Sequence, residues 1–182
     1  MHLLNLLLPL YPVLLPNHNL PMISFLVISD SHGDINNILR ALDTAGRVDG
    51  VIFLGDGIRD VEYVKNERNI PNLYTVLGNC DHFSPLLDSK RVDCLSFEGK
   101  SIVITHGDLY GAKYGDGGLL LLAKEYGADI ILHGHTHIAR AAYVDGIYLC
   151  NPGSIASSFD GASFGILTIS SGSALFSYKK LD

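Results

Sequence analysis

Residues 22–57 read MISFLVISDSHGDINNILRALDTAGRVDGVIFLGDG, and this stretch determines the fold class of the chain. Its opening apolar run, residues 23–29, predicts a buried β-strand, and a second apolar run follows at 51–54. Between them, Asp34 suits a helix N-cap, and apolar residues recur at helical spacing until Gly46 ends the helix. Continuous apolar strands separated by a helix are typical of a parallel sheet that is covered by helices on both faces.

The alternation continues for one more helix and one more strand. Residues 58–67 predict a short helix that ends before Pro71, and residues 73–77 predict a third strand. Residues 22–77 therefore have the β-α-β-α-β order of a mostly parallel, layered sheet.

The second half of the chain shows hairpin signals instead. Turn sequences such as Glu98-Gly99-Lys100 and Asp145-Gly146 separate pairs of apolar runs, and a short helix is expected at 119–126. The predicted strands of this half are 92–97, 101–105, 130–132, 139–144, 147–150, 164–169 and 175–179. We therefore predict an α/β fold in which two packed mixed β-sheets are flanked by helices, that is, a β-sandwich.

Composition limits the classes of function. The chain has 182 residues, of which 47% are hydrophobic and 18% charged, so one globular domain with a substantial core is expected. The formal net charge is −6 and the sequence shows no basic patch, which argues against long nucleic acid as a partner. The three cysteines, at positions 80, 94 and 150, have no paired spacing, which argues against a disulfide framework and suits the reducing cytoplasm.

Residues 1–21 form an apolar N-terminal extension. The segment lacks a basic residue before its leucines and a small-residue cleavage site, so it is a weak signal peptide. It is too short for a membrane span, and Pro9, Pro12 and Pro16 would interrupt a helix. We expect a single domain at 22–182 with the extension outside the fold, and a targeting or membrane-contacting role for the extension is the alternative.

Seven residues with metal-binding side chains follow five of the predicted strands. Because ligands of open sheets bind outside the carboxyl ends of the strands, we expect these side chains to meet at one edge and to hold two metal ions. They are Asp30, His32, Asp56, Asn79, His106, His135 and His137. Taken alone, Asp30 and Asp56 are equally well explained as turn residues, but four histidines beside glycines are not.

The spacing of these residues suggests how they hold metal. Asp30 and His32, like His135 and His137, are two residues apart, so in an extended segment each pair points to one side and can grip one ion. Asp56 has two carboxylate oxygens and can bridge two ions. Imidazole and oxygen ligands without a thiolate suit Mn, Fe, Zn, Co or Ni. Two such ions about 3.5–4 Å apart clamp the oxygens of an in-line phosphoryl displacement and lower the pKa of a bridging water.

The ordered motifs Asp-x-His, Gly-Asp, Gly-Asn, Thr-His-Gly and Gly-His-Thr-His resemble those of the calcineurin-like metallophosphoesterases, over residues 22–154. Gly-Asn-Cys-Asp, the short chain and Asn151-Pro152-Gly153-Ser154 resemble the small YfcE-like phosphodiesterase branch. The resemblance implies a metallophosphoesterase-like β-sandwich and a dinuclear-metal phosphodiesterase, in which a metal-bridging hydroxide attacks phosphorus in line. The implied ligands are Asp30, His32 and His137 for one ion, Asn79, His106 and His135 for the other, and Asp56 as the bridge.

The general acid is the part of the machinery that the family pattern does not identify. Many members have a histidine where this chain has Cys80. His82 is one candidate, although a solvated loop histidine is an equal interpretation, and Cys80 is a weaker one because thiols near cations tend to be thiolates. Asn79 and Asn151 are candidates for substrate binding, and a plain turn is the alternative for Asn151. His133 is expected to pack structurally.

Three functions stay open at this point. We expect an enzyme that hydrolyses a small phosphodiester with two divalent metal ions, Mn first and Ni, Zn, Fe or Co as alternatives. A non-catalytic protein-binding scaffold, like the retromer subunit that resembles this branch, would tolerate loss of ligands, and no ligand is missing here. A phosphomonoesterase would differ in the shape of the pocket. We expect a cytoplasmic protein without membrane contact, and the sequence leaves a homo-oligomer open.

Overall fold

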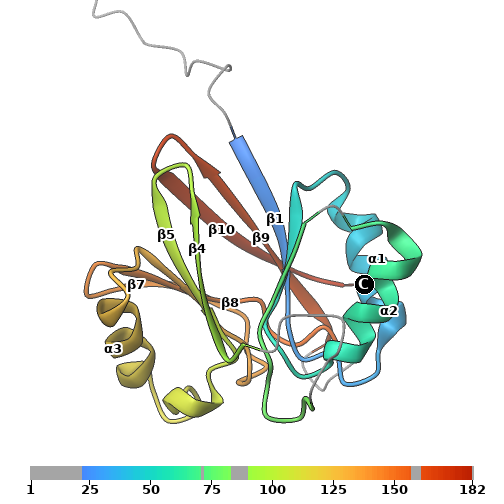
Figure 1. Cartoon of the computed structure of the whole chain (residues 1–182), viewed down its shortest axis with the longest axis horizontal. Coiled ribbons are helices and arrows are strands. Elements are labelled where there is room, and N and C mark those ends of the chain that lie inside the picture. Colours follow the sequence, from blue (N-terminus) through green and yellow to red (C-terminus); the bar gives the residue numbers. More distant parts are fainter. Residues whose placement is uncertain (1–21, 71, 83–89, 157–160, 182) are drawn as a thin grey trace, which may run out of the picture.

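The computed structural model describes residues 22–70, 72–82, 90–156 and 161–181. They form two five-stranded β-sheets with helices on the outside (Figure 1). The predicted α/β fold with two packed mixed sheets is confirmed. The predicted extension, residues 1–21, lies outside the described residues. Within the described ranges, no helix is long and apolar enough to cross a membrane.

The first sheet has the strand order β10-β9-β1-β2-β3. The strands β1 (Met22–Ile28), β2 (Gly50–Phe53) and β3 (Leu73–Thr75) run parallel, as their apolar runs predicted. The C-terminal hairpin of β9 (Ser163–Ser170) and β10 (Ser173–Lys180) joins this sheet because β9 pairs antiparallel with β1. β1 is therefore the central strand of the first sheet.

The second sheet has the strand order β4-β5-β6-β8-β7. Its three inner strands, β5 (Lys100–Thr105), β6 (Ile130–Leu132) and β8 (Ile147–Asn151), are parallel. The edge strands β4 (Val92–Phe97) and β7 (Arg140–Val144) pair antiparallel with β5 and β8 through the predicted hairpin turns. Each sheet thus has a parallel centre, which directs several strand ends to the same side.

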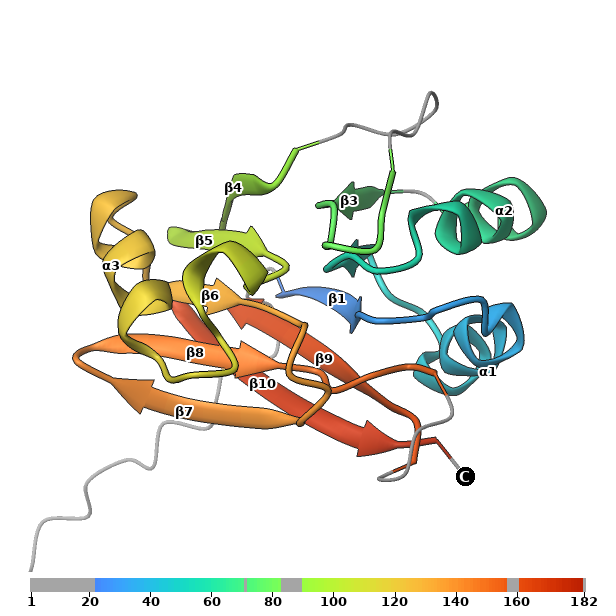
Figure 2. The same ribbon diagram turned by 90° about the horizontal axis from the view of Figure 1, so that it is seen from below.

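Helices cover the outer face of each sheet. Figures 1 and 2 both show α1 (Ile35–Ala45) and α2 (Ile58–Arg68) on one side of the molecule and α3 (Gly117–Glu125) on the opposite side. Asp34 caps α1 as predicted, since the backbone N–H of Asn37 donates to its carboxylate at 3.1 Å. The helices therefore close the outer faces, while the two sheets face each other inside.

The core has three apolar layers. Between the sheets, Val27 and Ile52 of the first sheet share one cluster with Ile104 and Leu132 of the second. Two further clusters lie beneath α1 and α2 and beneath α3. Because the inner strands are buried on both faces, their sequences are continuously apolar.

Four details differ from the sequence prediction. The ligand-bearing strands do not share one sheet: β1, β2 and β3 belong to the first and β5 and β6 to the second, and their ends meet because the sheets pack face to face. β3 ends at Thr75 because the chain then leaves the sheet, and the Leu77 N–H bonds the Lys90 carbonyl at 2.8 Å. The helix α3 begins two residues early, at Gly117, and a short 3₁₀ helix at Asp108–Tyr110 was not predicted.

Candidate metal centre

Left-handed backbone turns hold five of the seven predicted ligands. The φ angle is 57° at Asp30, 45° at His32, 60° at Asp56, 64° at His135 and 61° at His137. Positive φ is uncommon for residues with a Cβ atom, and such strain gathers at functional sites. The paired ligands therefore do not lie in extended segments, and the predicted strand-like alternation is wrong. Sharp turns aim these side chains instead.

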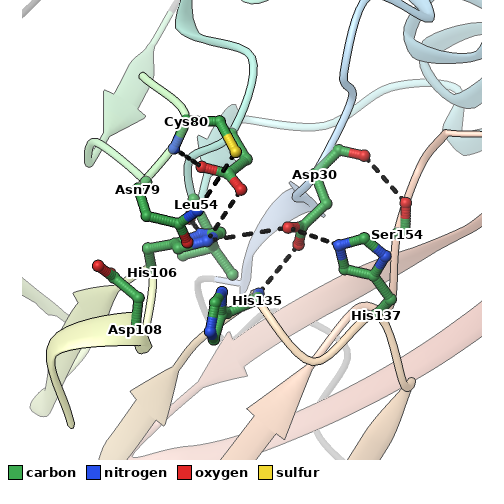
Figure 3. Close-up of polar contacts among 12 residues, drawn as sticks. Asp30, Leu54, Asn79, Cys80, His106, Asp108, His135, His137 and Ser154 are labelled. Atoms are coloured by element: carbon green, nitrogen blue, oxygen red, sulfur yellow. Dashed lines mark hydrogen bonds and ion pairs between the residues drawn. The ribbon is translucent and has the colours of Figure 1, made fainter. Parts of the chain in front are cut away.

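Two buried carboxylates form the centre of the cluster, those of Asp30 and Asp56. The Nε2 atom of His106 lies 3.9 Å from Asp30 Oδ1 and 3.3 Å from Asp56 Oδ2. The Nε2 atom of His32 lies 3.8 Å and 3.9 Å from the same two oxygens. His137 Nε2 is 3.1 Å from Asp30 Oδ1. Figure 3 shows Asp30, from the first sheet, between His106 and His137, which both follow strands of the second sheet.

The four histidines fall into two pairs. The rings of His32 and His137 have centroids 5.4 Å apart, and those of His106 and His135 are 5.0 Å apart. His135 and His137 therefore face different neighbours although they are two residues apart. The spacing argument that put them on one ion does not agree with this separation, and the assignment of each histidine to an ion stays a prediction.

Asn79 and Cys80 belong to the turn after β3. The Cys80 N–H donates to Asp56 Oδ1 at 2.7 Å, and Asn79 Nδ2 donates to Cys80 Sγ at 3.2 Å. Figure 3 shows both residues on the same side of the cluster as His106. The backbone of this turn thus orients the Asp56 carboxylate, and Asn79 as an amide ligand stays a prediction.

Two buried atoms of the cluster have no hydrogen-bond partner among the described residues, namely Asp30 Oδ1 and His106 Nε2. His106 Nδ1 lies 2.8 Å from the Leu54 carbonyl, so Nδ1 carries the proton and Nε2 directs a lone pair at the carboxylates. Lone pairs that face one another in a buried site need a cation between them. These residues therefore fit a divalent metal ion.

The types of donor atom in the cluster also favour a divalent metal ion. Three groups of side chains have ligand atoms within 4.8 Å of one another. They are Asp30, His32 and His137; Asp30, Asp56 and His106; and His32, Asp56 and Cys80. The first two groups share Asp30 and contain only oxygen and imidazole donors, which suit Mn, Fe, Ni, Co and Zn. The third adds a thiol that the sequence prediction did not count as a ligand.

The acidic and basic side chains of the cluster shift one another's pKa values. Burial opposes the ionisation of Asp56, yet its 3.3 Å contact with His106 and the hydrogen bond from the Cys80 N–H hold the pKa of Asp56 below its usual range. Burial likewise opposes protonation of His106, yet Asp56 and Asp30 raise the pKa of His106. In the metal-free protein, a proton on His106 Nε2 therefore balances the carboxylate charge as a metal cation would. A proton and a metal ion compete for this nitrogen's lone pair.

Asp81 is a positioning residue that sequence reasoning missed. Its carboxylate accepts backbone N–H groups at 2.7–2.9 Å from Asp56, Gly57, Ile58 and Gly78. It closes the N-terminus of α2, where Gly57 occupies the cap position and offers no side chain. The available signal was an Asp directly after Gly-Asn-Cys, together with a predicted helix at 58 that lacked a capping residue.

Arg91 and Asp108, also missed, connect the loops of the two sheets. Arg91 forms an ion pair with Asp108, which lies two residues after the ligand His106, and donates to the Gly78 carbonyl at 2.9 Å. The guanidinium thus ties the turn before Asn79 to the loop after β5. Nothing in the sequence spacing indicates this contact, because the partners lie far apart along the chain.

His133 and Asn151 support the loop that carries His135 and His137. His133 is buried, and burial lowers the pKa of His133 to about 4, in keeping with the structural role expected for it. Asn151 Nδ2 donates to the Gly134 carbonyl at 2.9 Å and to Thr136 Oγ1 at 3.1 Å, and Asn151 Oδ1 accepts from the Gly153 N–H at 2.8 Å. The Asn151 amide therefore positions the loop, and its role in substrate binding stays a prediction.

Both candidates for the general acid, His82 and Cys80, line one cavity of about 230 Å³. The same cavity borders His32 and Asp56, which places it beside the cluster. Burial and the neighbouring Asp56 raise the pKa of the Cys80 thiol, so without metal the thiol keeps its proton at neutral pH. Which of the two residues serves as the acid stays a prediction.

Residues 23–172 match the family model of the calcineurin-like phosphoesterase superfamily domain, and the chain belongs to this superfamily, as predicted. The chain is 35% identical over 134 residues to the probable metallophosphoesterase YsnB of Bacillus subtilis, which covers 71% of this chain and 73% of that protein. The crystal structure of a predicted phosphoesterase from Streptococcus pneumoniae TIGR4 superposes with a TM-score of 0.73 and 25% identity, covering 89% of this chain and 91% of that one.

A second kind of relative differs in its described role. The chain is 31% identical over 134 residues to vacuolar protein sorting-associated protein 29 of Schizosaccharomyces pombe, covering 71% of this chain and 70% of that protein. The family and the bacterial relative indicate a metallophosphoesterase, that is, a metal-dependent hydrolase. A similar protein is therefore named for protein sorting rather than for hydrolysis of a phosphoester.

Proposed function

We propose that the chain is a dinuclear metal phosphodiesterase that hydrolyses a small phosphodiester. One observation carries this proposal: two buried carboxylates and three imidazoles converge within ion-pair distances of one another, and Asp30 Oδ1 and His106 Nε2 have no hydrogen-bond partner among the described residues. A cluster of this composition costs free energy unless cations bind it, because like charges are held together without water.

The residues divide into two binding sets in this proposal. Two divalent ions, when bound, polarise a phosphoryl oxygen and make a nucleophile from water near neutral pH. The two sets share Asp56, and we favour Mn, with Ni, Zn, Fe or Co as alternatives. Asp30, His32 and His137 would hold one ion, and Asn79, His106 and His135 the other.

Other contacts keep the ligands in place for catalysis. The Leu54 carbonyl fixes the tautomer of His106, and the His135 N–H and the Ser154 hydroxyl fix Asp30 at 3.0 Å and 2.9 Å. His82 or Cys80 would then deliver a proton to the leaving oxygen from the neighbouring cavity. Asn79 would also contact the phosphate, since its amide lies beside the cluster.

Hydrolysis of bis(4-nitrophenyl) phosphate tests the proposal. The metal-free chain should be inactive, added Mn should restore turnover, and a chelator should abolish it again. Metal analysis on the same samples supplies the control, with two ions expected per chain. Two bound ions without turnover under Mn, Ni, Co or Zn would remove the proposed activity.

A non-catalytic, protein-binding role is the second candidate, and the similarity to vacuolar protein sorting-associated protein 29 favours it. The complete set of ligands argues for the enzyme, because a scaffold has no need of it. The same assay separates the two candidates, since a scaffold would bind metal without turning over any ester.

The proposal also covers the class of substrate, the cellular location, the partners and the oligomeric state. A phosphomonoesterase would use the same cluster, so 4-nitrophenyl phosphate should be tested beside the diester, and we expect the diester to be the better substrate. We also propose a cytoplasmic location and the absence of long nucleic acid as a partner, in line with the net charge of −6. Sedimentation would decide whether the chain forms a homo-oligomer.

A further inference from the structure

The carboxylate of Asp60, in the first turn of α2, connects the loop after β1 to this helix. Its Oδ2 atom accepts the Ser31 hydroxyl at 2.6 Å and the Gly33 N–H at 2.8 Å. The two donors are the residues directly before and after His32, a predicted metal ligand. One oxygen atom therefore holds the chain on both sides of His32.

The His32 ring depends on its backbone for its position. Its Nε2 atom lies 3.8 Å from Asp30 Oδ1 and 3.9 Å from Asp56 Oδ2, and both distances are longer than a hydrogen bond. The backbone of His32 has a φ angle of 45°, a conformation that persists only where the surrounding structure enforces it. The His32 N–H donates to the Asp56 carbonyl at 3.1 Å, and the hydrogen bonds to Asp60 hold the residues on either side.

The contact between Ser31 and Asp60 lies in a closely packed part of the loop. Ser31 is buried, so its hydroxyl has no water as an alternative partner. Gly57, at the cap position of α2, has a φ angle of 141°, and a Cβ atom there would overlap Ser31 Oγ and lie 2.7 Å from Asp60 Oδ2. The missing side chain at Gly57 thus leaves the space in which the hydroxyl reaches the carboxylate.

Asp60 and Asp81 support different ligands. Asp81 accepts backbone N–H groups around Asp56, whereas Asp60 holds the loop of His32. Asp60 belongs to none of the three groups of described residues whose ligand atoms lie within 4.8 Å of one another. An effect of Asp60 on a metal ion must therefore pass through the position of His32 or through the negative charge of the carboxylate.

We propose that Asp60 is a positioning residue that sets the affinity for one of the two metal ions, the ion that Asp30, His32 and His137 would hold. The inference rests on the proposed function, which requires two ions. Apart from the shared Asp56, the other ion would be held by side chains of other loops, and the hydrogen bonds of Asp60 do not reach them. Loss of the Asp60 carboxylate should therefore weaken one ion and leave the other bound.

Titration calorimetry of the metal-free full chain with Mn²⁺ tests this role without catalysis. Asp60→Ala should weaken one of the two binding events about 10- to 100-fold and leave the other unchanged, since partners of metal ligands contribute in this range. Asp60→Asn keeps an oxygen that can accept both hydrogen bonds, so it should bind both ions nearly as the unchanged chain does. Asp43→Ala removes an exposed carboxylate from α1 and is the control, with both ions unchanged.

The two Asp60 variants distinguish position from charge, because both lose the negative charge and only Asp60→Ala loses the acceptor. Equal weakening by Asp60→Asn and Asp60→Ala would assign the effect to charge and overturn the positioning role. Equal weakening of both ions by Asp60→Ala would also overturn it, because the proposed role concerns one ion only.

A variant of His32 tests whether Asp60 acts through this residue. His32→Gln should weaken the same ion, and Asp60→Ala should add little further loss in that background, because two changes that act by one route are not additive. A full additional loss of about 10- to 100-fold would reveal another route and contradict the proposal. If Asp60→Ala does not fold, Ser31→Ala still decides, since it removes one of the two hydrogen bonds and no charge. Unchanged affinity for both ions in Ser31→Ala would then overturn the role.

The same titrations separate a failure of this inference from a failure of the proposed activity. If Asp60→Ala selectively weakens one of two bound ions, but the unchanged chain hydrolyses no phosphodiester, the activity fails and the positioning role stands. If the unchanged chain hydrolyses bis(4-nitrophenyl) phosphate and Asp60→Ala binds both ions equally well, the positioning role fails and the activity stands.

Discussion

The two sheets contribute different chemistry to the candidate metal centre. Loops after the first sheet supply both carboxylates, Asp30 and Asp56, together with the turn of Asn79 and a single imidazole, that of His32. Loops around the second sheet supply three imidazoles and no carboxylate ligand. Negative charge therefore comes from one side of the sandwich and neutral nitrogen donors mostly from the other.

The difference extends to how each side is held. The first sheet fixes its ligands through a carboxylate, because Asp81 collects four backbone N–H groups around Asp56. The second sheet fixes its histidine loop through a neutral amide, that of Asn151. The two sheets therefore hold their candidate ligands by different means, a charged acceptor in the first and a neutral amide in the second.

The largest expected effect comes from removing one carboxylate of the first sheet. Asp56→Asn should lower metal content below one ion per chain and reduce turnover of bis(4-nitrophenyl) phosphate by well over about 100-fold, since even outer-shell partners of metal ligands cost roughly 10–100-fold. His135→Gln, from the second sheet, is the matched variant and should retain one ion. Metal analysis with both variants gives the comparison. Two ions retained by Asp56→Asn would end both the bridging assignment and the contrast between the sheets.

The next effect concerns the proton for the leaving group, which we expect from a first-sheet loop. His82→Ala should slow hydrolysis of an alkyl phosphodiester by about 100-fold or more, because a positioned acid contributes roughly 10²–10⁴-fold. Hydrolysis of a nitrophenyl ester should change little, since nitrophenolate leaves without a proton. Metal content should not change, because His82 is outside the ligand set.

The two esters together distinguish the possible roles of His82. Equal slowing of both would make His82 a positioning residue. No slowing of either would move the test to Cys80→Ser, measured on the same two esters, because Cys80 lines the same cavity.

A smaller effect is expected from Asp81. Asp81→Asn should lower the free energy of unfolding of the metal-free chain by about 1–3 kcal/mol, because buried N–H groups lose a charged acceptor. Asp43→Asn is the control, since its pair with Arg68 is exposed and exposed pairs contribute about 0–1 kcal/mol. Urea unfolding measures both. A cost for Asp81→Asn no larger than that for Asp43→Asn would show that the first sheet does not depend on this carboxylate.

Particular residues show how far sequence reasoning reaches. The strands were predictable because their apolar runs are buried on both faces, and Asp34 was predictable as a local cap. The meeting of ligands from two sheets was not, because strand pairing across the sandwich leaves no local signal. Local spacing also misled at His135 and His137, where positive φ angles override the alternation of a strand. Contacts such as Arg91 with Asp108 depend on loop conformations that only the folded chain defines.

The smallest effect is expected from the N-terminus. Strand pairing of the first sheet begins at Met22, which lies opposite Ser170, and the buried part of β1 begins at Phe25. A chain that starts at Met22 should therefore match the full chain in melting temperature, metal content and turnover of bis(4-nitrophenyl) phosphate. Differential scanning calorimetry and the metal-dependent assay, run on both chains at equal Mn, measure this. A lower melting temperature or lost metal in the shorter chain would mean that residues 1–21 support the first sheet, and our prediction that they lie outside the fold would be wrong.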